Sequence, residues 1–195
     1  MADYDPSTAL LVVDLQNDFA DPHGGLYVRG GEEVLPLVND EIRQATEAGA
    51  LVVFTQDWHP PTTPHFAKDG GVWPVHCVAE TWGAELVPGL DVAGPVIRKG
   101  VAGEDGYSGF SVRHPVTGEE DTTGLAELLR SHDVERVVIA GLATDYCVKE
   151  TALDSAKQGC VTTVLARAIR AVDLRPGDGD RALDEVRRAG ADVEG

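Results

Sequence analysis

The stretch V-V-I-A-G-L-A-T-D-Y-C-V-K-E, residues 137–150, decides how this chain folds. It begins with apolar, β-branched residues that are typical of a buried strand. The pattern breaks at Gly141 and resumes as a helix expected from Asp145 to Gln158. Cys147 therefore lies at the turn from strand to helix, where unpaired N–H groups and the helix dipole favour a thiolate and can receive negative charge from a substrate oxygen. A cysteine can also be a small apolar residue that packs a helix on a sheet, so its surroundings decide its role.

Strands and helices alternate along the rest of the chain. Continuous apolar runs predict buried strands, and apolar residues at helical spacing predict helices. The alternation predicts a three-layer α/β/α sandwich with a doubly wound, mostly parallel sheet, in a single domain over residues 1–195. The segments 56–94 and 100–118 have little periodicity and are expected to be loops. The expected strands are 8–13, 50–55, 95–98, 136–140 and 161–165, with an edge strand at 191–193, and the expected helices are 34–48, 123–131, 145–158 and 180–189.

The acidic composition limits the partners that the chain can have. Of its 195 residues 43% are hydrophobic and 25% are charged, with a formal net charge of -17. This charge argues against binding of nucleic acid and of anionic membranes. We expect a small-molecule partner on other grounds, namely the reactive residues, and leave a homo-oligomer open. No apolar run reaches membrane-spanning length, and the N-terminal residues lack the basic start of a secretory signal. Three cysteines, Cys77, Cys147 and Cys160, cannot all pair, which favours a reducing cytoplasm.

Reactive residues follow four of the predicted strands. Asp14 and Asp57 come after the first and second strands, Lys99 follows the third, and the fourth leads to Cys147. If the sheet is parallel, these residues meet at the edge formed by the carboxyl ends of the strands. An acid, a lysine and a cysteine gathered there can act as base, electrostatic helper and nucleophile. Taken singly, an Asp after a strand is often a loop cap and a Lys there is often solvated.

A second group of residues suits a metal ion. Asp57 and His59 are two residues apart, so they share a face in an extended segment. His65 and His76 follow within twenty residues of Asp57. One carboxylate and three imidazoles predict one divalent metal ion, which we expect to be Zn, Fe or Mn. The alternative is that histidines are scattered through a long loop.

Five segments together resemble the nicotinamidase/pyrazinamidase branch of the isochorismatase-like hydrolase superfamily. Each segment is a weak signal by itself, but their order and joint presence are specific. They are D-L-Q-N-D-F (14–19), D-W-H-P…H (57–65), W-P-V-H-C (73–77), R-K-G (98–100) and G-L-A-T-D-Y-C-V (141–148).

The resemblance implies a role for each matching residue. It implies a catalytic triad of Asp14, Lys99 and Cys147 that hydrolyses an amide through a cysteine thioester. It also implies a cis peptide at Leu142–Ala143, an oxyanion hole made by the N–H groups of Ala143 and Cys147, and the same α/β/α sandwich. The implied metal ligands are Asp57, His59, His65 and His76, and the implied pocket aromatics are Phe19, Trp73 and Tyr107.

Two alternatives to a nicotinamidase remain. The metal-free branches of the superfamily, isochorismatases and carbamoyl-cleaving hydrolases, share the triad and the fold. The histidine set and the W-P-V-H-C segment are what this chain has beyond them. A metal-binding protein without catalysis is the second alternative, and intact Asp14, Lys99 and Cys147 argue against it.

Overall fold

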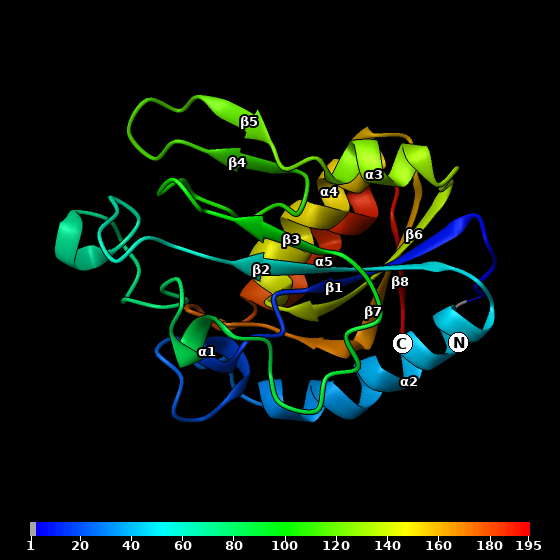
Figure 1. Ribbon diagram of the computed structural model, residues 1–195, viewed down its shortest axis with the longest axis horizontal. Coiled ribbons are helices and arrows are strands. Elements are labelled where there is room, and N and C mark those ends of the chain that lie inside the picture. The colour runs from blue at the N-terminus through cyan, green and yellow to red at the C-terminus, as the bar shows by residue number, and fades with distance from the viewer. Residues whose placement is uncertain (1–2) are drawn as a thin grey trace.

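A parallel β-sheet of six strands forms the middle of the molecule (Figure 1). The computed structural model describes residues 3–195. The strand order is β3-β2-β1-β6-β7-β8, and each pair of hydrogen-bonded neighbours is parallel. The strands are β1 (Thr8–Val13), β2 (Leu51–Asp57), β3 (Val96–Lys99), β6 (Arg136–Leu142), β7 (Val161–Arg170) and β8 (Asp192–Glu194).

Helices cover both faces of this sheet because its central strands are apolar on both faces. All six residues of β1 are buried. Leu10 and Val12 pack in one core cluster, whereas Leu11 and Val13 pack in the other. Full burial of one such side chain stabilises the fold by roughly 1.5–3 kcal/mol. The first cluster lies under α1 (Asn17–Ala20) and α2 (Val34–Glu47), and the second lies under α3 (Leu125–Ser131), α4 (Lys149–Lys157) and α5 (Asp178–Arg188) (Figure 1). These layers confirm the predicted sandwich.

The described helices are short for a membrane protein. The longest, α2, has 14 residues, whereas a helix needs about 20 apolar residues to cross a bilayer. Within residues 3–195, no helix combines the length and the apolar character that a membrane span requires.

The turn after β6 differs from the helix that the sequence predicted. A π-helical turn, Thr144–Val148, precedes α4, so regular α-helix begins only at Lys149. Gly141 shows why the pattern breaks where it does. Its φ is +116°, and a Cβ at this position would lie 2.1 Å from the carbonyl oxygen of Val13. Only glycine allows β6 to approach β1 this closely.

Several small elements lie outside the predicted strands and helices. The antiparallel strands β4 (Ser111–Arg113) and β5 (Glu120–Thr122) form a separate two-stranded sheet, so the prediction of a loop over residues 100–118 was wrong at β4. Their residues are exposed or half-buried, which removes the apolar alternation that reveals a strand. Short 3₁₀ turns lie at Gly31–Glu33, Ala67–Asp69 and Trp82–Ala84.

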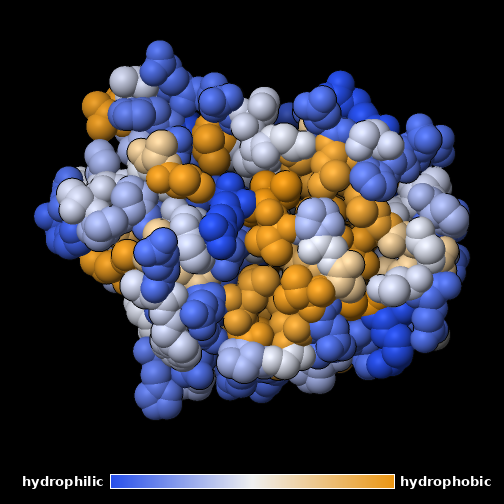
Figure 2. Space-filling view, viewed as in Figure 1, coloured by the Kyte–Doolittle hydropathy of each residue, from blue (hydrophilic) through white to orange (hydrophobic). Residues whose placement is uncertain are grey.

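Apolar side chains also gather on one outer face. Figure 2 shows an apolar area near the centre of the face on which Figure 1 shows the edge strand β3. Val96 of this strand is 38% exposed, and Val92 in the segment before it is 48% exposed. Exposed apolar area beside an edge strand is a surface that association between chains can cover. The homo-oligomer that the sequence left open stays a prediction.

Candidate active site

The carboxyl ends of four neighbouring strands carry the residues that the sequence predicted to meet. Asp14 follows β1, and Asp57 ends β2. Lys99 ends β3, and Cys147 lies in the turn after β6. All four side chains are buried. The strand order reverses between β1 and β6, and parallel sheets bind ligands at such switch points. The structure therefore brings the predicted triad together.

The ammonium group of Lys99 is the centre of this cluster. Its Nζ donates to Asp14 Oδ2 at 2.8 Å, to Asp57 Oδ1 at 2.5 Å and to the carbonyl oxygen of Gly106. The sulfur of Cys147 lies 3.9 Å from the same nitrogen. Burial lowers the pKa of Lys99, but attraction to the two carboxylates outweighs burial and raises this pKa well above its ordinary value. Lys99 therefore stays charged.

Burial decides the protonation of Cys147. It raises the pKa of the thiol well above its ordinary value, and the charge of Lys99 only partly opposes this. Burial also raises the pKa of Asp14, although Lys99 and a 2.6 Å hydrogen bond from Thr55 stabilise its carboxylate. Burial thus opposes the thiolate that the helix end was expected to favour. The sulfur of Cys147 lies within 4.8 Å of a carboxylate oxygen of Asp14, which can accept the proton of the thiol.

The turn before Cys147 has the backbone that the resemblance implied. The peptide bond Leu142–Ala143 is cis. Ala143 and Cys147 both line a pocket at the end of the sheet. The N–H groups of these two residues as oxyanion donors stay a prediction.

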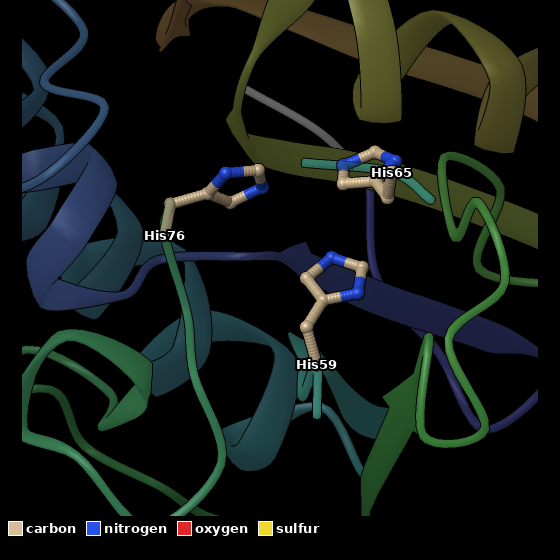
Figure 3. A group of neighbouring side chains, drawn as sticks. All are labelled: His59, His65 and His76. Atoms are coloured by element: carbon tan, nitrogen blue, oxygen red, sulfur yellow. The ribbon is translucent and has the colours of Figure 1, made fainter. Parts of the chain in front are cut away.

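Three buried histidines, His59, His65 and His76, lie together (Figure 3), and two of them, His65 and His76, line the pocket that contains Cys147. One ring nitrogen from each of His59, His65 and His76 lies within 4.8 Å of the others. Nδ1 of His76 donates to the carbonyl oxygen of Pro74, 2.8 Å away, and Nδ1 of His65 pairs with Asp105 Oδ1 at 2.5 Å. The Nε2 atoms of these two rings remain available as ligands.

The donor set fits a metal ion. Both ring nitrogens of His59 are buried without a hydrogen-bond partner among residues 3–195. A buried polar atom without a partner costs about 1–3 kcal/mol, and coordination to a cation would remove that cost. Burial lowers the pKa of His76 to about 4, which keeps its imidazole neutral and able to bind a metal. Neutral imidazoles at this spacing suit Zn, Fe or Mn.

Asp57 lies between the triad and the histidines. One of its oxygens accepts from Lys99, and the other lies 3.8 Å from His59 Nε2. Burial raises the pKa of Asp57, but Lys99, His59 and His76 together outweigh burial and hold the pKa well below its usual range. Its carboxylate is therefore ionised, as a metal ligand must be, and its place in the ligand set stays a prediction. Cys77 follows His76 in sequence but packs in the core, with its sulfur 3.8 Å from the carbonyl oxygen of Gly83.

The three predicted aromatic residues line the pocket that contains Cys147. These residues are Phe19, Trp73 and Tyr107. The indole N–H of Trp73 donates to the hydroxyl of Tyr107 at 2.7 Å, so each ring fixes the position of the other. Tyr146, which the sequence argument did not select, packs edge-on against Trp73 with ring centroids 4.8 Å apart. Its place directly before Cys147 was the available signal.

The similarity of this chain to known proteins identifies its family. Residues 8–194 match the Isochorismatase domain. This chain belongs to the isochorismatase family. It is 36% identical to the nicotinamidase of Escherichia coli, a match that covers 95% of this chain and 93% of that protein.

Solved isochorismatase-family structures share the same fold. The pyrazinamidase of Pyrococcus horikoshii in complex with zinc has a TM-score of 0.85 and 42% identity, and the match covers 96% of this chain and 98% of that chain. PnC1 from L. infantum in complex with nicotinate has a TM-score of 0.87 and 36% identity, and the match covers 98% of this chain and 94% of that chain. The predicted family and fold are confirmed.

Other residues of this isochorismatase-family site hold the predicted ones in place. Gln16 is fully buried, and its side-chain amide bonds both the N–H and the C=O of Asp57, each at 2.8 Å. It thereby continues the pairing of β1 with β2 beyond the end of β1. Thr55 contacts Asp14, and Asp105 contacts His65. Sequence spacing gave no signal for these contacts, because each depends on which loops the fold places side by side.

Proposed function

We propose that this enzyme hydrolyses the carboxamide of nicotinamide to nicotinate and ammonia through a thioester on Cys147. The expected enzyme class, an amidohydrolase, is confirmed by the nicotinamidase relatives. The substrate is supported by their names and by the relative whose structure contains nicotinate. One observation carries the proposal for this chain: a buried Asp14, Lys99 and Cys147 cluster ends in an aromatic pocket beside three histidines.

The first half-reaction transfers the acyl group to sulfur. Asp14 takes the proton of Cys147, and the sulfur attacks the carboxamide carbon. Negative charge then develops on the carboxamide oxygen, and the N–H groups of Ala143 and Cys147 stabilise it. One such donor contributes about 3 kcal/mol to transition-state stabilisation. Asp14 returns its proton to the departing nitrogen, so that ammonia leaves and the thioester remains.

The second half-reaction returns the enzyme to its starting state. Asp14, again a carboxylate, takes a proton from water as the water oxygen attacks the thioester carbon. The carbon–sulfur bond breaks, nicotinate leaves, and the proton passes to the sulfur of Cys147. Throughout both steps the ammonium of Lys99 stabilises the carboxylate form of Asp14. This charge keeps a buried carboxyl group available as a base.

The aromatic lining of the pocket suits a substrate with a flat ring beside the carboxamide. Trp73 and Phe19 offer faces for stacking, and stacked aromatic pairs contribute about 0.5–1.5 kcal/mol beyond area burial. His59, His65 and His76, with Asp57, would hold a divalent ion next to the same pocket. When bound, such an ion would supply Lewis-acid chemistry and a contact for the ring nitrogen. The zinc in the P. horikoshii relative supports zinc as its identity.

Ammonia release from nicotinamide tests the proposal. We expect turnover by the wild type, none by Cys147→Ala, and nearly wild-type turnover by Cys160→Ala, because Cys160 lies outside the site. Mass spectrometry of a quenched reaction should find the acyl group on Cys147. An acyl group on Cys77 or Cys160 would show that the nucleophile is assigned wrongly. Activity only on a carbamoyl compound or on isochorismate would instead place the chain in a metal-free branch.

A further inference from the structure

Asp105 makes the shortest side-chain contact to the histidine cluster. Its Oδ1 lies 2.5 Å from His65 Nδ1, and its side chain is 25% exposed. A carboxylate only accepts hydrogen bonds, so Nδ1 of His65 carries the proton and Nε2 presents a lone pair. We propose that Asp105 is a positioning residue that fixes the tautomer and the orientation of His65 for metal binding. This inference rests on the metal site of the proposed function.

The three histidines differ in what holds them. His76 is held by a backbone carbonyl oxygen, that of Pro74 two residues away. Stacking holds the ring of His59 against His65, with centroids 4.6 Å apart and planes 20° apart. Among the described residues, His65 alone has a carboxylate within hydrogen-bonding distance of its ring, whereas the Asp57 carboxylate lies 3.8 Å from His59 Nε2. Such carboxylate–histidine pairs increase the basicity of the ligand nitrogen, and their loss weakens metal binding by about 10–100-fold.

The backbone of Asp105 is itself fixed. Its N–H and C=O pair with the C=O and N–H of Arg113 at 2.7 and 2.8 Å, which joins it to the β4–β5 sheet. The next residue, Gly106, accepts a hydrogen bond from Lys99, and a Cβ there would lie 2.8 Å from the Cβ of Lys99. Tyr107 then accepts from Trp73. Three consecutive residues thus contact the histidine cluster, the triad and the pocket in turn, and of the three only Asp105 bonds a histidine nitrogen.

Because these contacts are separate, a side-chain variant of Asp105 can distinguish a positioning role from a general structural role. Replacing the carboxylate of Asp105 leaves the backbone pairing with Arg113 and the contact of Gly106 with Lys99 in place. We therefore expect metal affinity to fall while the melting temperature of the metal-free protein stays near that of the wild type. A purely structural role would lower the melting temperature of the metal-free protein as well.

Metal titration of Asp105 variants tests the inference. Metal-free wild type, Asp105→Asn, Asp105→Ala and the control Asp121→Asn would each compete with a chromophoric chelator for Zn²⁺. Asp121 is exposed on β5, so its variant makes the same change of charge without touching His65. We expect Asp105→Ala to bind Zn²⁺ about 10–100-fold more weakly than the wild type. The loss should be smaller in Asp105→Asn, which keeps an acceptor oxygen, and absent in Asp121→Asn.

Two results would overturn the inference. One is Zn²⁺ affinity in both Asp105 variants equal to that of the wild type. The other is an equal loss of Zn²⁺ affinity in Asp121→Asn, which would show that the effect comes from net charge. The readout does not depend on turnover, so the two proposals fail separately. If Zn²⁺ affinity depends on Asp105 but the protein releases no ammonia from nicotinamide, only the substrate is refuted. Normal turnover with unchanged Zn²⁺ affinity in the Asp105 variants would refute only the role of Asp105.

Discussion

Replacing Lys99 with methionine should destabilise the fold more than any surface lysine could. Lys99 Nζ is fully buried between the carboxylates of Asp14 and Asp57. Methionine fills a similar volume but leaves two like charges facing each other in the interior. Breaking a buried ion pair from one side costs about 3–5 kcal/mol. We therefore expect Lys99→Met to lower the free energy of unfolding at pH 8 by about 3–5 kcal/mol.

The sign of the pH dependence follows from the carboxylates. Without Lys99, burial and mutual repulsion raise the folded-state pKa values of Asp14 and Asp57 above the unfolded value of about 3.9. The folded variant then binds more protons than the unfolded chain at pH values between the unfolded and folded pKa values. Its stability relative to the wild type therefore recovers as pH falls through that window. In the wild type the pKa of Asp14 is already raised, but that of Asp57 is held low, so the contribution of Asp57 to this recovery is found only in the variant.

Urea unfolding at pH 8 and at pH 5.5 measures the loss of unfolding free energy in Lys99→Met and the pH dependence of that loss. Lys149→Met is the matched control, because Lys149 is half-buried and pairs with Glu150 and Glu185 at 3.1 and 3.4 Å. Such a pair contributes about 0–1 kcal/mol. The double variant Lys99→Met/Asp14→Asn should regain part of the loss, because it removes one of the two facing charges. If Lys99→Met lowers the free energy of unfolding by less than about 1 kcal/mol, or by the same amount at both pH values, the reasoning is refuted.

Other predictions address the catalytic unit, the metal and the ring. Asp14→Asn removes the base, and combining it with Cys147→Ala should reduce kcat hardly further than Cys147→Ala alone, whereas additive losses would argue for independent roles. Elemental analysis should find roughly one equivalent of metal per chain, lost in His59→Ala and kept in His23→Ala, which lies at an exposed site. Metal retained after His59→Ala would reject the site. Benzamide, which lacks the ring nitrogen, should be hydrolysed markedly more slowly than nicotinamide, and equal rates would remove the metal from substrate recognition. Trp73→Ala should weaken nicotinamide binding by about 0.5–1.5 kcal/mol beyond the lost contact area, measured as the change in kcat/KM.

The parts of the fold that the sequence predicted are those that hydrophobic patterning controls. Each central strand is a continuous apolar run, because helices cover both faces of the sheet. Once the strands were placed, their parallel order put Asp14, Lys99 and Cys147 at one edge without any knowledge of the loops. The β4–β5 sheet escaped prediction because its residues bury no apolar face.

The parts of the site that escaped prediction depend on contacts between loops. Asp105 lies 40 residues from His65 in sequence, and no periodicity links the two segments. The protonation of Cys147 also escaped, because a helix end is visible in the sequence whereas the degree of burial around the sulfur is not. Burial is the larger effect on this thiol. Sequence therefore identified the reacting groups better than it identified the state in which they rest.

The charge of the site favours a neutral substrate over an anionic one. Asp14 and Asp57 together carry two negative charges, and Lys99 carries one positive charge. Within the described chain, the residues that line the pocket include no arginine and no lysine. A substrate with a carboxylate, such as isochorismate, could therefore pair only with the proposed metal ion and with no side chain of the pocket wall, in a protein of net charge -17. A carboxamide on a flat ring brings no charge to desolvate and gains aromatic contacts, which is why the side chains of this pocket support an amide of the nicotinamide type.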